Sequence, residues 1–108
     1  MDAIVQAKRV LEIFKEMSQI PRGSGNEKGI SDYIVNFAHN LGLEATQDSE
    51  WNVVIKKPAT PGYENRPSVI LQGHIDMVCV KGHDSNHDFT KDPIANIIEG
   101  EWMHADDT

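Results

Sequence analysis

The sequence predicts an α/β fold in which two helices pack on a mixed sheet, with a hairpin at the C-terminal end. Three observations predict it. Two stretches with helical spacing of apolar residues come first, shorter apolar runs follow them, and loops containing glycine and proline separate these segments. With 108 residues, we expect one domain over residues 1–108, large enough for a modest core.

Both helices are expected in the first part of the chain. Residues 3–17 carry apolar side chains at helical spacing, namely Val10, Leu11, Phe14 and Met17. A glycine-containing break follows, in which Ser24 stands three residues before Glu27, the spacing of a capping box for a second helix. Gly42 marks the end of that helix, whose expected buried stripe is Ile30, Tyr33, Ile34, Phe37 and Leu41.

After Gly42 the pattern changes to that of strands. Residues 43–46 alternate between apolar and polar, and residues 51–56 form a second apolar run after a polar turn. Residues 57–67 contain three prolines and predict an exposed loop. Val69, Ile70 and Leu71 then follow one another without polar interruption, which predicts a strand buried on both faces in the centre of the sheet.

The last third of the chain begins with a polar stretch. Residues 81–93 have no periodicity and predict a long surface loop, a kind of segment that is often functional. Residues 94–98 and 101–104 flank Glu99-Gly100 and predict a hairpin.

Composition limits the classes of function. A net charge of −7 argues against a nucleic-acid partner, because such affinity comes mainly from clustered Lys and Arg. There is no apolar run of the roughly 20 residues that cross a membrane, and the first residues lack a signal-peptide pattern, so we expect a cytoplasmic protein with no membrane partner. The single cysteine, Cys79, lies among apolar residues and is expected to be buried and inert.

His74 and Asp76 are the candidates for chemistry, because they come directly after the predicted central strand. Ligands in open α/β sheets bind at the carboxyl ends of strands. A neutral imidazole is a common zinc ligand, and a nearby carboxylate can accept its second ring N–H and fix its orientation. On the spacing alone, a structural interpretation remains open, in which His74 bonds a loop and Asp76 caps a turn.

Other polar groups favour structural roles. His83 and His87 have the i, i+4 spacing of helical metal ligands, but the residues between them favour a turn and hence a solvated loop. Residues 23–29 contain three glycines but follow a helix rather than a strand, which favours a cap and turn over a phosphate-binding loop.

Three motifs resemble the N-terminal part of aminoacyl-histidine dipeptidases, within the carboxypeptidase G and aminoacylase group of di-zinc exopeptidases. They are Ile20-Pro21-Arg22-Gly23-Ser24-Gly25-Asn26-Glu27, Leu71-Gln72-Gly73-His74-Ile75-Asp76-Met77-Val78 and His87-Asp88-Phe89-Thr90-Lys91-Asp92-Pro93-Ile94. The resemblance covers nearly the whole chain and implies the N-terminal portion of a metallopeptidase catalytic domain.

The resemblance also implies roles for the two candidate residues. His74 matches a zinc ligand of the family, and Asp76 matches the catalytic-site aspartate that supports it. The complete enzymes are expected to hold two zinc ions and to hydrolyse dipeptides such as Xaa-His by metal-activated water.

By the same resemblance, other parts of the site lie beyond Thr108. These are the metal-bridging aspartate, the glutamate pair that contains the general base, and the remaining ligands. We therefore expect a fragment or truncated product that lacks activity alone. The alternative is a non-catalytic domain that binds a partner, associates with itself through an uncovered sheet edge, or completes a site in trans.

Overall fold

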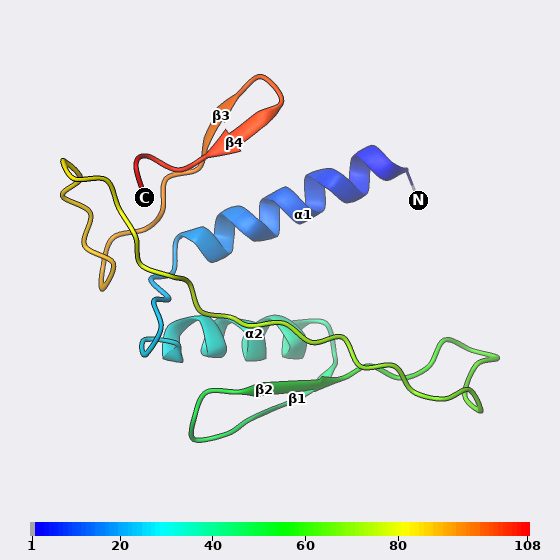
Figure 1. Ribbon diagram of the computed structural model, residues 1–108. Helices are drawn as coiled ribbons and strands as arrows, with labels where there is room; N and C mark the ends of the chain where they lie inside the picture. Colours follow the sequence, from blue (N-terminus) through cyan, green and yellow to red (C-terminus); the bar gives the residue numbers. More distant parts are fainter. Residues whose placement is uncertain (1) are drawn as a thin grey trace. The chain divides into compact units, whose positions relative to one another are not determined.

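The computed structural model describes residues 2–108 (Figure 1). The elements in chain order are α1 (Ala3–Ser18), α2 (Lys28–Asn40), β1 (Glu44–Gln47), β2 (Val53–Lys56), β3 (Ile97–Glu99) and β4 (Trp102–His104). The chain divides into two compact units, one made of the chain up to Ile30 together with Asp76–Thr108 and the other of Ser31–Ile75. The predicted α/β class, both helices and the C-terminal hairpin are confirmed.

Helix α1 begins and ends close to its predicted bounds. The carboxylate of Asp2 accepts a hydrogen bond from the backbone N–H of Ile4 at 3.0 Å and so caps the first turn. At the other end Ser18 is buried and donates to the carbonyl of Phe14 at 2.8 Å. The apolar side chains of Val10 and Phe14, expected to face a core, are largely or partly exposed.

Helix α2 begins later than the capping box predicts. Its first residue is Lys28, and the Glu27 carboxylate accepts a bond from the N–H of Gly25 at 2.6 Å. The prediction that Ser24 caps α2 is therefore wrong. Ile30, within the predicted stripe, is fully buried, whereas Leu41 lies beyond the last turn and is mostly exposed.

The predicted end of α2 at Gly42 is confirmed. Gly42 adopts a positive φ of 72°, which a glycine reaches without steric cost. The N–H of Leu43 then bonds the carbonyl of Ala38 at 3.0 Å and closes the helix end.

Two antiparallel hairpins make up the sheets of residues 2–108. Strands β1 and β2 pair in a register that places Ala45 opposite Ile55, and β3 and β4 pair with Ile98 opposite Met103. The sheets are therefore two separate pairs, and no single mixed sheet forms within the described residues.

The predicted central strand is not formed. Residues 68–73 belong to no strand of the structure, and the side chains of Val69, Ile70 and Leu71 are 82, 88 and 94% exposed. Figure 1 shows this yellow-green stretch as an extended chain without an arrow. A strand buried on both faces requires neighbouring strands and covering helices, and residues 2–108 do not supply them here.

The predicted loop at residues 81–93 contains no helix or strand. After it, the N–H of Ile94 bonds the carbonyl of Ser18 at 2.8 Å, and the side chain of Asn96 donates to the Ser18 hydroxyl at 3.2 Å. These bonds attach the start of the last segment to the end of α1.

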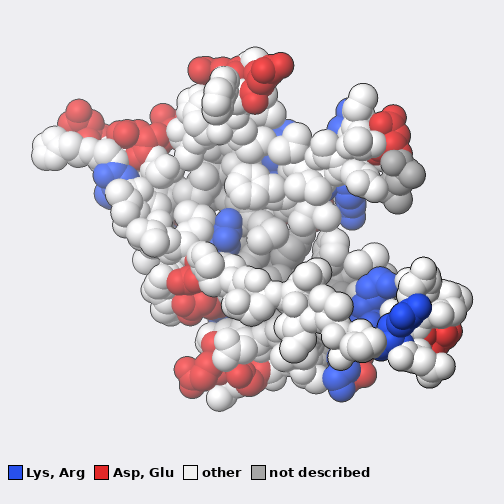
Figure 2. All heavy atoms as spheres, turned by 45° about the vertical axis from the view of Figure 1, so that its right-hand side comes forward, with Lys and Arg blue, Asp and Glu red and all other residues white. Residues whose placement is uncertain are grey.

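No helix in the described part of the chain combines the length and apolar character that a membrane crossing requires. On the face shown in Figure 2, the acidic side chains stand in separate groups with wide uncharged areas between them.

Candidate functional site

Asp76 is held by a residue from the connection between the two helices. The hydroxyl of Ser24 donates a hydrogen bond to Oδ2 of Asp76 at 2.5 Å, although the two residues are 52 positions apart in the sequence. Hydrogen bonds from a hydroxyl to a carboxylate are short and stronger than bonds between neutral groups. The contact therefore fixes a carboxylate that the sequence assigns to the site.

Backbone hydrogen bonds bring these two segments together. Gly23 and Met77 form an isolated parallel bridge. The N–H of Met77 donates to the carbonyl of Arg22 at 2.8 Å, and the N–H of Ser24 donates to the carbonyl of Met77 at 3.3 Å. We call residues 22–24 together with Asp76 and Met77 the clamp.

Arg22 adds a positive charge to the clamp. Partial burial lowers the pKa of its guanidinium, and the negative charge of Asp76 opposes that change. The positive charge of Arg22 and the negative charge of Asp76 therefore attract each other.

Gly23 permits the close approach of the two segments. A Cβ atom at this buried position would lie 2.5 Å from Sγ of Cys79, well inside van der Waals contact. Cys79 itself is exposed, so the prediction of a buried cysteine is wrong. Its neighbours Val78 and Val80 are also largely exposed, so no segment of the described residues covers this stretch.

His74, the predicted metal ligand, is exposed. It belongs to the unit Ser31–Ile75, whereas Asp76 opens the second segment of the other unit. Because residues 72–76 form no strand, the alternation that would place His74 and Asp76 on one face of a sheet does not apply.

Within residues 2–108, no group of three or more His, Cys, Asp or Glu side chains is arranged to hold a metal ion. His83 is exposed and His87 half-buried in a loop without helical structure, in agreement with the loop interpretation of this pair. His74 is one of several exposed histidines, and it is distinguished by the position of Asp76 two residues on in the sequence.

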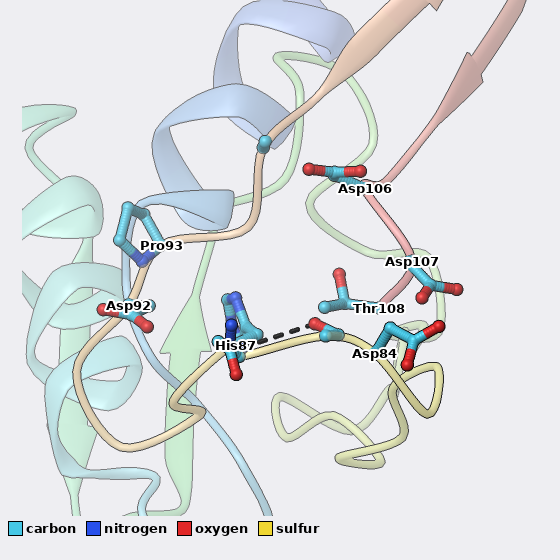
Figure 3. A pocket seen from close by; sticks show the side chains of 10 residues that line it. Asp84, His87, Asp92, Pro93, Asp106, Asp107 and Thr108 are labelled. Atoms are coloured by element: carbon cyan, nitrogen blue, oxygen red, sulfur yellow. Dashed lines mark hydrogen bonds between the residues drawn. The ribbon is translucent and has the colours of Figure 1, made fainter.

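A hollow of about 430 Å³ lies on the unit that contains the clamp, lined by the polar loop and the last residues of the chain. Figure 3 shows His87 of the loop, and Asp106 and Thr108 from the last residues of the chain, around this space. The His87 ring packs edge-on against Phe89, and its buried Nε2 has no hydrogen-bond partner among the described residues.

A second hollow, in the other unit, is a groove of about 530 Å³ between β2 and the extended residues 68–73. Its apolar lining includes Val54, Ile55 and Leu71, all of which are exposed. Residues 69–71, the predicted central strand, thus form one side of this groove without belonging to a sheet.

The sequence did not reveal Ser24 as the partner of Asp76. Its spacing from Glu27 suggested a helix cap, and no local pattern indicates a partner 52 residues away. The only signal was indirect, because Ser24 lies in a motif that resembles the dipeptidases.

No protein-family profile matches the chain. The chain is 47% identical over 94 residues to cytosol non-specific dipeptidase of Escherichia coli strain K12. The matched region covers 87% of this chain and 19% of that protein. The crystal structure of aminoacylhistidine dipeptidase from Vibrio alginolyticus matches with a TM-score of 0.81 and 47% identity, over 88% of this chain and 19% of that one.

This chain is similar to one part of a dipeptidase. The predicted resemblance to the N-terminal portion of aminoacyl-histidine dipeptidases is confirmed. A weaker similarity, 28% over 82 residues, links it to a protein of Emericella nidulans named as a probable carboxypeptidase, so the names of these relatives are those of hydrolases. The chain spans about a fifth of the length of these relatives.

Proposed function

We propose that this chain carries part of the catalytic domain of a zinc-dependent dipeptidase. The observation that supports this most is 47% identity over 87% of the chain to a dipeptidase. The same similarity favours a cytoplasmic location, because that relative is named as a cytosolic enzyme.

Within this proposal His74 is a zinc ligand and Asp76 supports it. His74 is exposed and therefore accessible to a metal, while the Asp76 carboxylate is fixed by Ser24. A carboxylate near a zinc-bound histidine orients the ring and raises its basicity. In the whole protein, two zinc ions would polarise the peptide carbonyl and supply a nucleophilic water for hydrolysis of dipeptides such as Xaa-His.

We expect no hydrolysis by the 108-residue chain alone. A catalytic zinc needs about three protein ligands and an open position. Residues 2–108 contain no group of three suitable donors.

A chimera tests the proposal. The matching 94 residues of the Escherichia coli dipeptidase are replaced by those of this chain, and the kcat for dipeptide hydrolysis is measured with zinc present. We expect hydrolysis by the chimera and a loss of about 100-fold or more in the chimera with His74→Ala.

A matched control is His39→Ala in the same chimera, because His39 is an exposed histidine near the end of α2. We expect this variant to keep the activity of the chimera. A folded chimera without hydrolysis, or one in which His74→Ala has no more effect than His39→Ala, contradicts the proposal.

A second candidate function is self-association, and the exposed run Val69, Ile70 and Leu71 favours it. An extended segment without a paired neighbour can add to the same segment of a second copy through backbone hydrogen bonds. Analytical ultracentrifugation tests it. A dimer that dissociates when Ile70 is changed to Lys supports this function, and a monomer at high micromolar concentration contradicts it.

A further inference from the structure

We propose that the groove between β2 and residues 68–73 binds residues 68–73 of a second copy of this chain. The exchange is reciprocal, so each copy supplies one strand and one groove. This inference rests on self-association, the second candidate function, and adds to it the site on the molecule and the segment of the partner that fills it.

The edge of β2 that borders the groove is free to pair. Strand β2 pairs with β1, and their sheet contains no third strand within the described residues. The groove is lined by β2 and by no residue of β1, so it lies along the other edge of β2, with residues 68–73 on its far side. Backbone N–H and C=O groups on an open strand edge are a template for another strand. The groove therefore offers a place for one more strand.

Residues 68–73 have the properties of a strand that lacks a partner. The segment is extended, and its three aliphatic side chains are more than 80% exposed. It contains no charged residue and no proline, the residues with which proteins commonly protect an open edge. The segment can therefore pair through its backbone without burying a charge.

The lining of the groove suits an uncharged apolar segment. Val54 and Ile55 contribute aliphatic side chains that are 59 and 40% exposed. The charged residues in the lining are Lys56 and Lys57, and Nζ of Lys56 lies 3.3 Å from Oε1 of Glu44 on β1. An uncharged strand leaves this ion pair in place and adds no charge to the apolar part of the groove.

Symmetry makes a second copy the partner that fits. The chain reverses in residues 57–67, so residues 68–73 run back along β2 (Figure 1). About a two-fold axis, the two copies of residues 68–73 would lie antiparallel and side by side, each next to β2 of the other copy. The two hairpins and the two exchanged segments would then form one continuous sheet. Such an interface requires a self-complementary surface, and each copy carries both the groove and the strand.

The exposed apolar area is sufficient for a weak dimer. Five aliphatic residues of the groove and the segment together expose on the order of 600 Å² per copy, namely Val54, Ile55, Val69, Ile70 and Leu71. Two copies would bury about 1,200 Å², the lower end of the range for specific interfaces. We therefore expect a dimer at high micromolar concentration that dissociates on dilution into monomers whose residues 69–71 are unpaired.

The test is the dissociation constant of the dimer, measured by analytical ultracentrifugation, with substitutions on the two sides of the groove. We expect Val54→Lys and Ile70→Lys each to raise this constant tenfold or more, because each places a charge in an apolar interface twice. The control is Leu41→Lys, since Leu41 is 60% exposed and lies outside the groove. It should change the constant by less than about twofold.

The results separate the inference from the proposed function. If Ile70→Lys dissociates the dimer while Val54→Lys acts like Leu41→Lys, the copies associate through the exposed run alone. That result overturns the inference and leaves self-association standing. An unaltered chain that stays monomeric at high micromolar concentration overturns both.

Disulfide cross-linking identifies the neighbour of β2 directly. In a Cys79→Ala background, a copy with Val54→Cys is mixed with an isotope-labelled copy with Ile70→Cys and oxidised mildly. We expect disulfides between the two kinds of copy, because the segment of one lies beside β2 of the other. Replacing the second copy by Leu41→Cys should lower the yield about tenfold. Equal yields from the two mixtures overturn the inference.

Discussion

The predicted central strand and the segment that follows it have different outcomes. Val69, Ile70 and Leu71 are more than 80% exposed and pair with no strand in residues 2–108. Met77, a few residues later, bonds the backbone of Arg22 and Ser24, and Asp76 accepts a bond from the Ser24 side chain. The apolar run is thus unpaired, whereas the segment that contains Asp76 and Met77 is held.

This difference shows what an apolar run can and cannot predict. Three successive aliphatic residues indicate that burying the segment is favourable. Burial also requires other segments that cover the run, and the run itself does not specify which ones these are. Met77 has a partner in the connection between α1 and α2, because the backbone of Gly23 pairs with it.

Among the substitutions that test this difference, Asp76→Ala is expected to change the free energy of unfolding most. The variant removes the acceptor of the Ser24 hydroxyl and the charge near Arg22, and a hydrogen bond to a charged group contributes about 1.5–3 kcal/mol. We expect the free energy of unfolding in urea to fall by about 2 kcal/mol. A change below about 0.5 kcal/mol would mean that the clamp does not stabilise the fold.

Gly23→Ala tests the close approach inside the clamp. The added Cβ meets Sγ of Cys79, and overpacking of this kind costs about 1 kcal/mol or more. We expect the free energy of unfolding to fall by about 1 kcal/mol. In a Cys79→Ala background the same change should be neutral or slightly stabilising, because the conflicting sulfur is gone and alanine restricts the unfolded chain. Equal losses in both backgrounds would contradict this cause.

Acid should affect the β1–β2 hairpin, which belongs to the same unit as the exposed run. A side-chain bond from Asn52, followed by backbone bonds from Asn52 and Glu50, holds the pKa of Asp48 below its ordinary value. A lowered carboxylate pKa gives stability that is present above the unfolded value and is lost as pH falls through the folded one. We expect the amide NMR signals of Glu50 and Asn52 to shift below about pH 4.

Asp48→Asn is the control for this acid response. Its amide oxygen can accept the two backbone bonds that reach Oδ1, although not the side-chain bond from Asn52 to Oδ2. Because the amide does not titrate, the signals of Glu50 and Asn52 should stay constant through the same pH range. A shift of equal size in this variant would assign the acid response to another group.

Ile70→Ser is expected to change the free energy of unfolding least. Its side chain is 88% exposed, and substitutions at exposed positions usually change stability by no more than about 0.5 kcal/mol. We expect the free energy of unfolding at low concentration to stay within that range. A loss above about 1 kcal/mol would show that Ile70 is buried in solution, and so would remove the contrast with Asp76.

Local signals predicted much of the fold. The spacing of Val10, Leu11 and Phe14 located α1, and the positive φ that Gly42 adopts ends α2 where a glycine is expected. Both hairpins follow from runs separated by polar turns. These elements depend on residues that are close together in the sequence, so the spacing of apolar and polar residues is enough to predict them.

Features that depend on distant residues were not predicted. The capping-box spacing of Ser24 and Glu27 is a local pattern, but the Ser24 hydroxyl bonds Asp76 instead. In the same way, the exposure of Leu71 and Cys79 depends on which segments cover them, and residues near them in sequence do not determine that. His74 and Asp76 were predicted from their place after an apolar run and from family resemblance, and their roles remain predictions.

Amide hydrogen exchange of the unaltered chain across residues 69–77 tests the contrast most directly. For the monomer, we expect the N–H of Met77 to be protected by its bond to Arg22, while the N–H groups of Val69, Ile70 and Leu71 exchange at nearly the rate of an unstructured peptide. Protection of residues 69–71 equal to that of Met77 would contradict this contrast, because the apolar run would then also have a partner.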